Sequence, residues 1–524
     1  MMKIKILLSM LIACFFLVSC GGDDDKNIRV AVTPDAATIK VGASQTLSAS
    51  VTGTSKTQVT WSVDESGGGS VTTAGVYTAP AVAGTYHVRA TSVYDKKKSA
   101  AATINVVALD NAMVRVFHAS PDAPKVNLWV NDAVVKSGLD YQKSTGNLTL
   151  PEGSYKIAVE GIIPGGNQVV IGPVNLALAG NTDYDVIAVN SVGKIEPLVL
   201  TDTGKLSDPS KVRVRVAHLA AGAPEVKVFV TAPDADLMGA TALGSFSFKG
   251  SLGPVEVAAG TYRIRVALAN NTVVFDSGSV ELMAGKDLLI GAIPNVGNGE
   301  SPIRLAVLDA DATVILADMS TGADLRVVHN SADAPAVDVI VNNATSAAIS
   351  NLAFPDFTDY VSLPAATYNF KVTATGTLTP AVIDVDVPLA NGAQYTLLAV
   401  GAVANIEPLL LEDNNRSVAT EAKVRLVHGS TLAGNVDIYV LPSGTSTANQ
   451  TAAFSNIPFK ADTGYVSLAA GKYDVIITPA GQPSVEAIKA TLDFNAGAVY
   501  TAVARDGENL TTPLGVIGLD ALAD

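Results

Sequence analysis

The sequence predicts an all-β chain made of tandem β-sandwich modules in a multidomain arrangement. The chain has 524 residues, and at about 100 to 150 residues per domain this length indicates four or five separate cores. Only 16% of the residues are charged, and Val, Ala, Thr, Gly and Leu dominate, a composition that favours strands and turns over surface helices. Short stretches of alternating apolar and polar residues separated by turn residues recur along the chain, as expected for half-buried strands.

The N-terminal segment has the pattern of a secretion signal. Lys3 and Lys5 precede an almost continuous apolar run at residues 6–18, and Ser19-Cys20-Gly21 follows it. A basic start, a short apolar run and small residues at the end are typical of a cleaved signal peptide, and the run is too short for a comfortable transmembrane span. We therefore expect residues 1–19 to be removed.

The residues at this cleavage site resemble the bacterial lipobox, at which a diacylglycerol is attached to a cysteine before cleavage. The match is Leu17-Val18-Ser19-Cys20, and a second, Leu11-Ile12-Ala13-Cys14, would leave a stunted apolar run before it. The resemblance implies lipid attachment at Cys20, and the Gly that follows this cysteine implies onward transport to the outer membrane. A plain secretory signal with an accidental cysteine is the alternative.

Net charge and cysteine content limit the binding partners and the chemistry expected of the chain. The net charge is −14, which works against nucleic-acid binding because phosphate recognition needs clustered Lys and Arg. Beyond Cys20 the chain has no cysteine, so the mature protein can form neither intrachain disulfides nor thiolate metal sites. Residues 20–27 are polar and flexible in composition, and we expect a tether there.

The first module is expected at residues 28–107. In Val59-Thr60-Trp61-Ser62-Val63 the apolar side chains alternate with polar ones, which predicts a strand with Trp61 in the core. This stretch resembles the bacterial immunoglobulin-like (Big) domains in that segment, in residues 30–34 and 75–80, and in Gly84-Thr85-Tyr86-His87-Val88. The resemblance implies an Ig-like spacer without catalytic residues.

The rest of the chain contains four repeats. Each begins with a similar five-residue strand ending in His, at residues 114–118, 214–218, 325–329 and 424–428. His118 and His329 are 211 positions apart, and His218 and His428 are 210 apart, so a two-module unit was duplicated. We expect the modules at 112–202, 211–311, 324–413 and 422–524.

The sequences that follow these histidines carry a family resemblance. Residues 114–124, Val-Arg-Val-Phe-His-Ala-Ser-Pro-Asp-Ala-Pro, and 325–335, Leu-Arg-Val-Val-His-Asn-Ser-Ala-Asp-Ala-Pro, resemble the domain-of-unknown-function family numbered 4397. The resemblance extends over all four repeats and implies tandem β-sandwich domains of an exported bacterial protein. It implies no activity.

The repeated histidine has two interpretations. It ends an apolar strand face just before a turn, which favours a structural hydrogen bond to the turn backbone. Asp122 follows His118 at four positions and Asp333 follows His329 likewise, but one His and one carboxylate fall short of the usual metal ligand count. A ligand role is the less favoured interpretation, and we expect no catalytic residue, no metal site and no cofactor.

The second strand of each repeat gives the candidate interaction face. Its inward positions are aliphatic, but one outward position is large and apolar in every repeat: Trp129, Phe229, Ile340 and Tyr439. The outward face of the first strand adds Arg115 and Arg326. Exposed aromatic and Arg side chains are typical of interaction hot spots. The alternative is that this face packs against a neighbouring module or a loop of its own domain.

These features predict a lipid-anchored protein of the cell envelope or cell surface with a binding, adhesive or structural role and no enzymatic one. Its expected partners are the membrane, through the lipid on Cys20, and an envelope or extracellular protein or glycan. We expect an outer-membrane lipoprotein, on its periplasmic or outer side, in which duplication raises avidity. The alternative is an envelope enzyme or accessory protein acting on polysaccharide, which would need a cleft with convergent polar groups.

Overall fold

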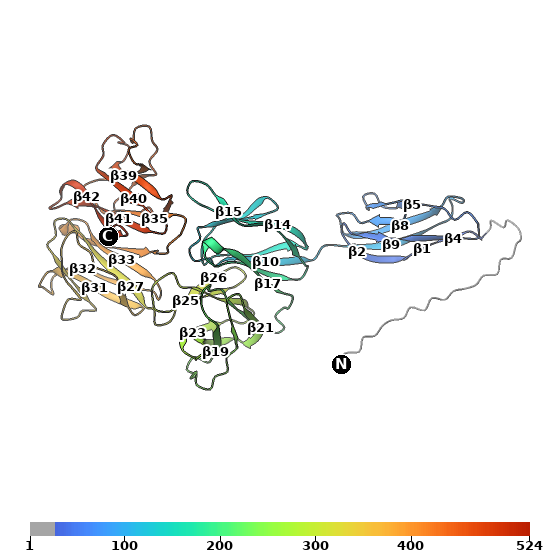
Figure 1. Cartoon of the computed structure of the whole chain (residues 1–524), viewed down its shortest axis with the longest axis horizontal. Coiled ribbons are helices and arrows are strands. Elements are labelled where there is room, and N and C mark those ends of the chain that lie inside the picture. Colours follow the sequence, from blue (N-terminus) through green and yellow to red (C-terminus); the bar gives the residue numbers. More distant parts are fainter. Residues whose placement is uncertain (1–26, 524) are drawn as a thin grey trace. The chain divides into compact units, whose positions relative to one another are not determined.

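The structure, a computed structural model, describes residues 27–523. The chain divides into two compact units, Met1–Asp110 and Asn111–Asp524, drawn in blue and from cyan to red in Figure 1. The described part contains β-strands and a few short 3-10 turns, including Val192–Lys194 and Val403–Asn405, but no α-helix. The all-β prediction is confirmed.

The first unit is a β-sandwich whose core includes Tyr77 and Ile104, with Trp61 packed against it as predicted. Its sheets, with neighbouring strands in order, are β1 (Arg29–Thr33) and β4 (Ser48–Thr52); β2 (Ala36–Lys40), β9 (Ser99–Val107), β8 (Gly84–Ser92) and β5 (Val59–Val63); and β3 (Ser44–Thr46), β7 (Val76–Thr78) and β6 (Ser70–Val71).

The second unit contains four modules, each with an inner sheet built on the first strand of the repeat and an outer sheet built on the second. The first module has the inner order β13 (Ser144–Pro151), β10 (Asn111–His118), β16 (Asp183–Val189), β17 (Glu196–Asp202) and the outer order β12 (Ala133–Leu139), β11 (Val126–Val130), β14 (Gly153–Gly161), β15 (Gln168–Leu178). The second has the inner order β21 (Ser251–Ala258), β18 (Lys211–His218), β24 (Asp287–Pro294), β25 (Ile303–Leu308), β26 (Thr313–Leu316) and the outer order β20 (Gly244–Phe246), β19 (Val226–Thr231), β22 (Gly260–Leu268), β23 (Val273–Leu282).

The third and fourth modules repeat this plan. The third has the inner order β30 (Val361–Leu363), β27 (Ala323–Asn330), β33 (Gln394–Val400), β34 (Glu407–Asp413) and the outer order β29 (Ile349–Leu352), β28 (Val337–Val341), β31 (Ala366–Ala374), β32 (Ala381–Leu389). The fourth has the inner order β38 (Val466–Leu468), β35 (Ala422–His428), β41 (Val499–Gly507), β42 (Thr511–Asp520) and the outer order β37 (Phe454–Ile457), β36 (Val436–Pro442), β39 (Gly471–Pro479), β40 (Ile488–Phe494).

Each inner sheet contains one parallel pair in an otherwise antiparallel sheet. β10 runs parallel to β16, β18 to β24, β27 to β33 and β35 to β41. The register is the same in all four, because the equivalent pairs are Val114–Tyr184, Val214–Leu288, Leu325–Tyr395 and Val424–Tyr500. This common register allows positions to be compared between modules residue by residue.

The core of each module lies between its inner and outer sheets. In the first module Val114 and Val116 of β10 pack with Val126 and Leu128 of β11, and the three other modules have equivalent clusters. These alternating aliphatic positions are the ones that the strand pattern predicts to point inward. The tandem β-sandwich prediction is thus confirmed for the fold class.

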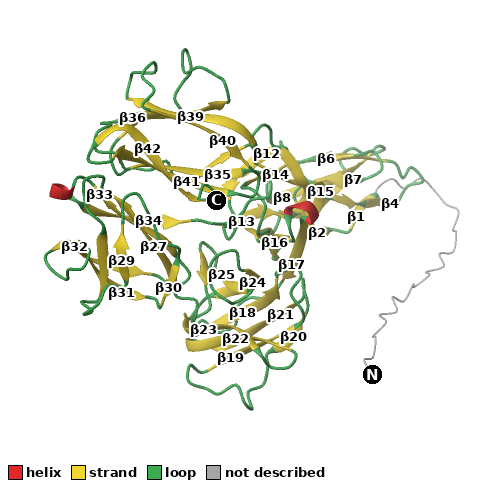
Figure 2. Ribbon diagram, turned by 60° about the vertical axis from the view of Figure 1, so that its left-hand side comes forward, coloured by secondary structure: helices red, strands yellow, loops and turns green. Residues whose placement is uncertain are grey.

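A second kind of core joins the modules in pairs through their inner sheets. Phe117 and Ile187 of the first module pack with Leu289 and Ala306 of the second, all at most 1% exposed. Val328, Leu398, Val427 and Val503 form the matching cluster between the third and fourth modules. Figure 2 shows β27, β33 and β34 beside β35, β41 and β42. The first strand of every repeat is therefore buried on both faces.

Candidate functional site

The structure corrects the exposure expected of Arg115 and Arg326. Their residues are 8% and 4% exposed, because the outward face of the first strand lies in the joint between paired modules. Arg115 donates to the Asp309 carbonyl oxygen over 2.9 Å, and Arg326 donates to Asp520 Oδ1 over 2.7 Å. Both arginines therefore bind the partner module, which is the alternative that the sequence left open.

The joints also contain carboxylates, which accept hydrogen bonds from these and neighbouring arginines. Asp202 of β17 forms ion pairs with Arg213 and with Arg215, the latter over 3.1 Å. Burial alone would raise the pKa of Asp202, but the Arg213 hydrogen bond and the backbone N–H of Gly204 hold that pKa at about 2. Asp202 therefore stays ionised and holds the joint near neutral pH.

The joint between the third and fourth modules uses Asp413, the counterpart of Asp202. Its side chain is 0% exposed and pairs with Arg425, and it also accepts hydrogen bonds of 2.6 Å from the Tyr360 hydroxyl and from Thr396 Oγ1. Since a buried charge is tolerated only with such partners, these residues serve the fold of the pair.

The outward positions Phe229, Ile340 and Tyr439 are also buried, at 4%, 3% and 4% exposure, which corrects the exposure expected of them. Phe229 lies under the connection between β19 and β20, with which it lines a pocket. Tyr439 packs with Leu441, Ile476 and Ala452, the last in the connection between β36 and β37. Loops of the same domain cover these two side chains, as the alternative interpretation allowed.

Trp129 is the exception among the predicted face residues, because its side chain stays partly exposed. β11 and β12 are joined by the two residues Asn131 and Asp132, with φ of 48° and 64°. Two positive φ values in a two-residue connection define the tight hairpin turn that Asn and Asp favour. This connection is too short to fold back across the outer sheet of the first module, so the Trp129 side chain remains partly exposed.

Polar groups surround the Trp129 ring. Glu160 Oε2 accepts hydrogen bonds from Trp129 Nε1 over 3.4 Å, from Asn127 Nδ2 over 2.9 Å and from Asn167 Nδ2 over 3.3 Å. Asn127 and Glu160 face each other across β11 and β14, whereas the equivalent pairs are Lys227–Ala267, Asp338–Thr373 and Asp437–Thr478 in the other modules. The carboxylate–amide cluster is therefore specific to the first module.

Apolar side chains flank this cluster. Val134 pairs with Trp129 across the hairpin and is 44% exposed, and Val169 pairs with Glu160 and is 55% exposed. We call the set of Trp129, Asn127, Glu160, Val134 and Val169 the Trp129 face. An indole ring offers a flat apolar surface, and the carboxylate and amide beside it offer acceptors and donors. Such a surface suits a ligand with an apolar face and hydroxyl groups at its edge.

The repeated histidines have the structural role that the sequence favoured. His118 Nε2 lies 3.0 Å from the Pro124 carbonyl oxygen, and His218, His329 and His428 make the equivalent contact to residues 224, 335 and 434. Each ring also meets an aromatic ring edge to face. The predicted hydrogen bond to the turn backbone is confirmed.

The carboxylates four residues after two of these histidines hold a short turn. Asp122 accepts from the Val192 N–H over 2.7 Å, and Asp333 accepts from the Val403 N–H over 2.8 Å. Both N–H groups begin 3-10 turns of the first and third modules. Within residues 27–523 no group of three or more His, Cys, Asp or Glu side chains could hold a metal ion.

The predicted lipid attachment residue Cys20 lies outside the described residues. No helix in the described part of the chain is long and apolar enough to cross a membrane.

The fold and the paired joints define a chain of tandem β-sandwich modules. A family model with the description "Domain of unknown function (DUF4397)" matches residues 112–229, 323–439 and 442–519, which is more than half of the chain. The chain belongs to this family. The family resemblance expected from the sequence is thus confirmed over these residues, whereas the Ig-like assignment of residues 28–107 stays a prediction.

Several solved structures show a distant similarity. The Bacillus anthracis TIE protein is 14% identical, with 87% of this chain and 76% of that chain covered and a TM-score of 0.14. A putative adhesin from Bacteroides ovatus is 12% identical, with 41% and 97% covered and a TM-score of 0.12. The Bacteroides ovatus protein SGBP-B, solved with a mixed-linkage heptasaccharide, is 13% identical, with 64% and 92% covered and a TM-score of 0.12. Function does not carry over at scores this low. No curated protein matches the chain.

Sequence reasoning missed Asn127, Glu160 and Asn167 because their cluster depends on cross-strand register and on the loop after β14. The signal that could have found the Trp129 face is the length of the hairpin connection. It has two residues in the first module, Asn131 and Asp132, but runs over residues 232–243 in the second and 443–453 in the fourth. A short connection leaves an outer sheet bare.

Proposed function

We propose that this chain is a non-enzymatic binding protein of the cell envelope whose Trp129 face binds glycan. One observation carries the proposal: among the equivalent positions of the four repeats, only Trp129 stays partly exposed, and it is the one beside a carboxylate and two amides. The C–H face of a sugar ring stacks on an indole, and its hydroxyl groups bond to carboxylate and amide groups.

The geometry favours one binding face per chain. Ile340, the counterpart of Trp129 in the duplicated half, is buried and aliphatic, so avidity from a repeated face is not part of the proposal. The duplicated half would instead extend the compact unit that carries the face.

Presentation on the cell surface completes the proposal. A lipid on Cys20 would hold the chain on the outer membrane, residues 20–27 would be the tether and the Ig-like residues 28–107 the spacer, followed by modules at 112–202, 211–311, 324–413 and 422–524. The pattern of Lys3, the apolar run and the lipobox-like residues supports the anchor.

A panel of envelope and extracellular polysaccharides tests the binding face, with the full chain carrying Cys20→Ser to keep it free of lipid. Trp129→Ala should weaken binding at least about tenfold, as expected for a central aromatic contact, whereas Trp129→Phe should retain part of it. Glu160→Gln should also weaken binding, because it replaces a charged acceptor with a weaker neutral amide. Met238→Ala is the matched control, since Met238 is an 87% exposed apolar side chain in the second module.

Equal binding by Trp129→Ala and the control, with unchanged thermal unfolding, would overturn the glycan proposal. So would binding to protein partners alone. The anchor is tested separately by labelling cells with a radioactive fatty acid: Cys20→Ser should lose the label and Cys14→Ser should keep it. The opposite result would move the anchor to the other cysteine.

A further inference from the structure

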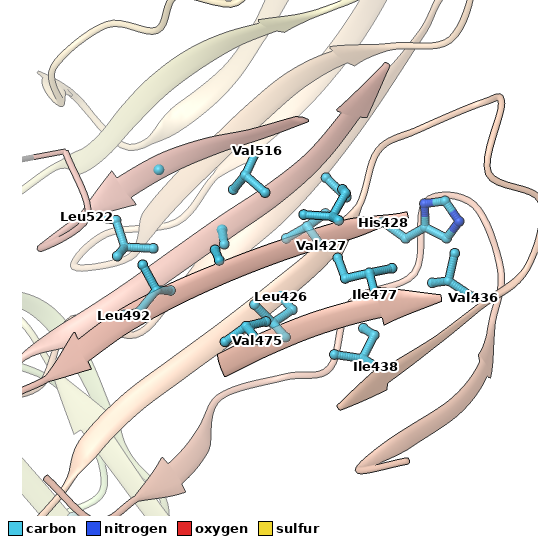
Figure 3. A pocket seen from close by; sticks show the side chains of 15 residues that line it. Leu426, Val427, His428, Val436, Ile438, Val475, Ile477, Leu492, Val516 and Leu522 are labelled. Atoms are coloured by element: carbon cyan, nitrogen blue, oxygen red, sulfur yellow. The ribbon is translucent and has the colours of Figure 1, made fainter. Parts of the chain in front are cut away.

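The fourth module contains an apolar cavity between its two sheets. The space has a volume of about 240 Å³, and Figure 3 shows the side chains that surround it. Val436 lies toward one end with His428, Leu426 lies between the ends, and Leu492 and Leu522 lie at the other. Apart from His428 the lining is aliphatic or glycine.

Two small residues on neighbouring strands create this space. Ala502 of β41 pairs with Gly518 of β42, two residues beyond Tyr500 in the register that all modules share. The equivalent pairs in the first, second and third modules are Val186–Val199, Ile290–Val307 and Leu397–Leu410. The fourth module therefore lacks two branched side chains that its relatives place here.

The comparison with the second module shows the effect of this change. The corresponding space between its sheets is about 10 Å³, with Ile290 among the residues around it. In the second module Phe275 of β23 pairs with Val266 of β22 and is fully buried. In the fourth module the equivalent residue of β40 is the smaller Ile488, which pairs with Ile477. The same fold is filled in one module and left open in the other.

Leu522 closes the far end of the cavity. A Cβ atom on residue 518 would lie 2.8 Å from the Cβ atom and from the carbonyl oxygen of Leu522, so the turn after β42 can approach only because residue 518 is glycine. The N–H groups of Leu522 and Ala523 bond to the carbonyl oxygens of Leu519 and Asp520. Leu522 therefore lies on a short turn rather than within a strand.

The cavity is elongated and offers water few partners. Ile488, Ala490 and Leu492, alternate residues of β40, all line it, and four residue steps along a strand span about 13 Å. His428 Nε2 is already bound to the Gly434 carbonyl oxygen. A buried water needs two to four polar partners, whereas apolar cavities of about 150 Å³ stay dry and bind small hydrocarbons.

We propose that the fourth module binds one hydrocarbon chain in this cavity, the alkyl or acyl chain of a lipid without net charge. The narrow, elongated shape favours a chain over a planar ring, and the aliphatic lining excludes a charged group from the interior. The site is independent of the Trp129 face, because it lies in another module between the sheets rather than on an outer surface.

Isothermal titration calorimetry with 1-decanol tests this proposal on the full chain carrying Cys20→Ser. We expect one bound decanol per chain. Ala502→Ile, which places the second module's residue in the cavity, should weaken binding at least tenfold. Ile488→Phe fills the cavity from the opposite sheet and should also weaken decanol binding. This second variant replaces Ala502→Ile in the test if Ala502→Ile fails to fold. Ile290→Val is the matched control, an equivalent strand position in the second module, and should leave binding unchanged.

Two outcomes would overturn the proposal. One is that the Cys20→Ser chain does not bind decanol, and the other is that Ala502→Ile and Ile488→Phe both bind decanol as tightly as that chain does. A second arm distinguishes the source of the chain. If the chain belongs to a membrane lipid, the Cys20→Ser chain should float with phosphatidylcholine vesicles more than its Ala502→Ile variant does, and Leu522→Ala should increase flotation. If the ligand is a free alkyl chain, none of these variants should float with the vesicles.

Discussion

Replacing Asp202 with Asn removes a buried negative charge from the joint between the first and second modules without changing the size of the side chain. The Asp202 pKa falls from its ordinary value of 3.8 to about 2 in the folded chain. At about 1.4 kcal/mol for each pH unit, this drop corresponds to about 2 kcal/mol of stability at neutral pH. Asn can still accept from the Gly204 N–H, a 2.9 Å bond in the structure, so the loss should come mainly from Arg213 and Arg215.

The sign of the pH dependence follows from the lowered pKa. A carboxyl group that ionises more readily in the folded state stabilises the fold above its unfolded pKa and loses that effect as pH falls through the folded pKa. The parent and Asp202→Asn should therefore differ by about 2 kcal/mol at pH 7, and the difference should fade between about pH 4 and pH 2.

The chain provides its own reporter for this experiment. It has two tryptophans, and Trp61→Phe leaves Trp129 as the single tryptophan, in the module that contains Asp202. Guanidinium unfolding followed by Trp129 fluorescence measures the stability. Asp132→Asn is the control: Asp132 pairs with Lys156 at 74% side-chain exposure, and exposed pairs contribute little. Equal stability of Asp202→Asn and the parent at pH 7, or an undiminished difference near pH 2, would refute the reasoning.

Two further predictions use the same reporter. Burial lowers the His118 pKa to about 4, so the unfolded chain takes up a proton at higher pH than the folded one. The free energy of unfolding should therefore fall by about 3 kcal/mol between pH 6.5 and pH 4. His118→Gln should flatten this pH dependence, and an unchanged slope would show that another group causes it. Ile187→Ala should cost about 2 to 5 kcal/mol, because Ile187 is 0% exposed in the joint. Val135→Ala, at a 46% exposed position of the same module, should change little, and equal losses in the two variants would contradict the buried joint.

The fold class could be predicted because strand signals are local. Alternating residues such as Val126 and Leu128 identify inward faces from sequence alone, and the repeated His-ending strand reveals the number of modules. The pairing of modules could not be predicted in this way. Arg115 and Phe117 lie at the alternate positions expected to face solvent, but that side is buried against another inner sheet. A contact between residues as distant in sequence as 115 and 309 produces no periodic pattern in the sequence.

The candidate site shows the same limit. Trp129, Phe229 and Tyr439 occupy one repeated position and were expected to behave alike, yet only Trp129 remains partly exposed. What separates them is the length of the following connection, which decides whether a loop returns over the sheet. The strand pattern identifies the position, and the turn chemistry of Asn131 and Asp132 decides its exposure.

The two-sided burial of the first strand has a consequence for sequence variation. Along β11, in the outer sheet of the first module, buried positions alternate with partly exposed ones, so this strand and its connections are freer to diversify. β27 is buried at all eight of its positions and β35 at all seven, so neither face tolerates change without disturbing a core. A saturation mutagenesis map should show unbroken intolerance along β10, β18, β27 and β35 and an alternating pattern along β11 and β14. New specificities in this architecture would therefore arise on the outer sheets.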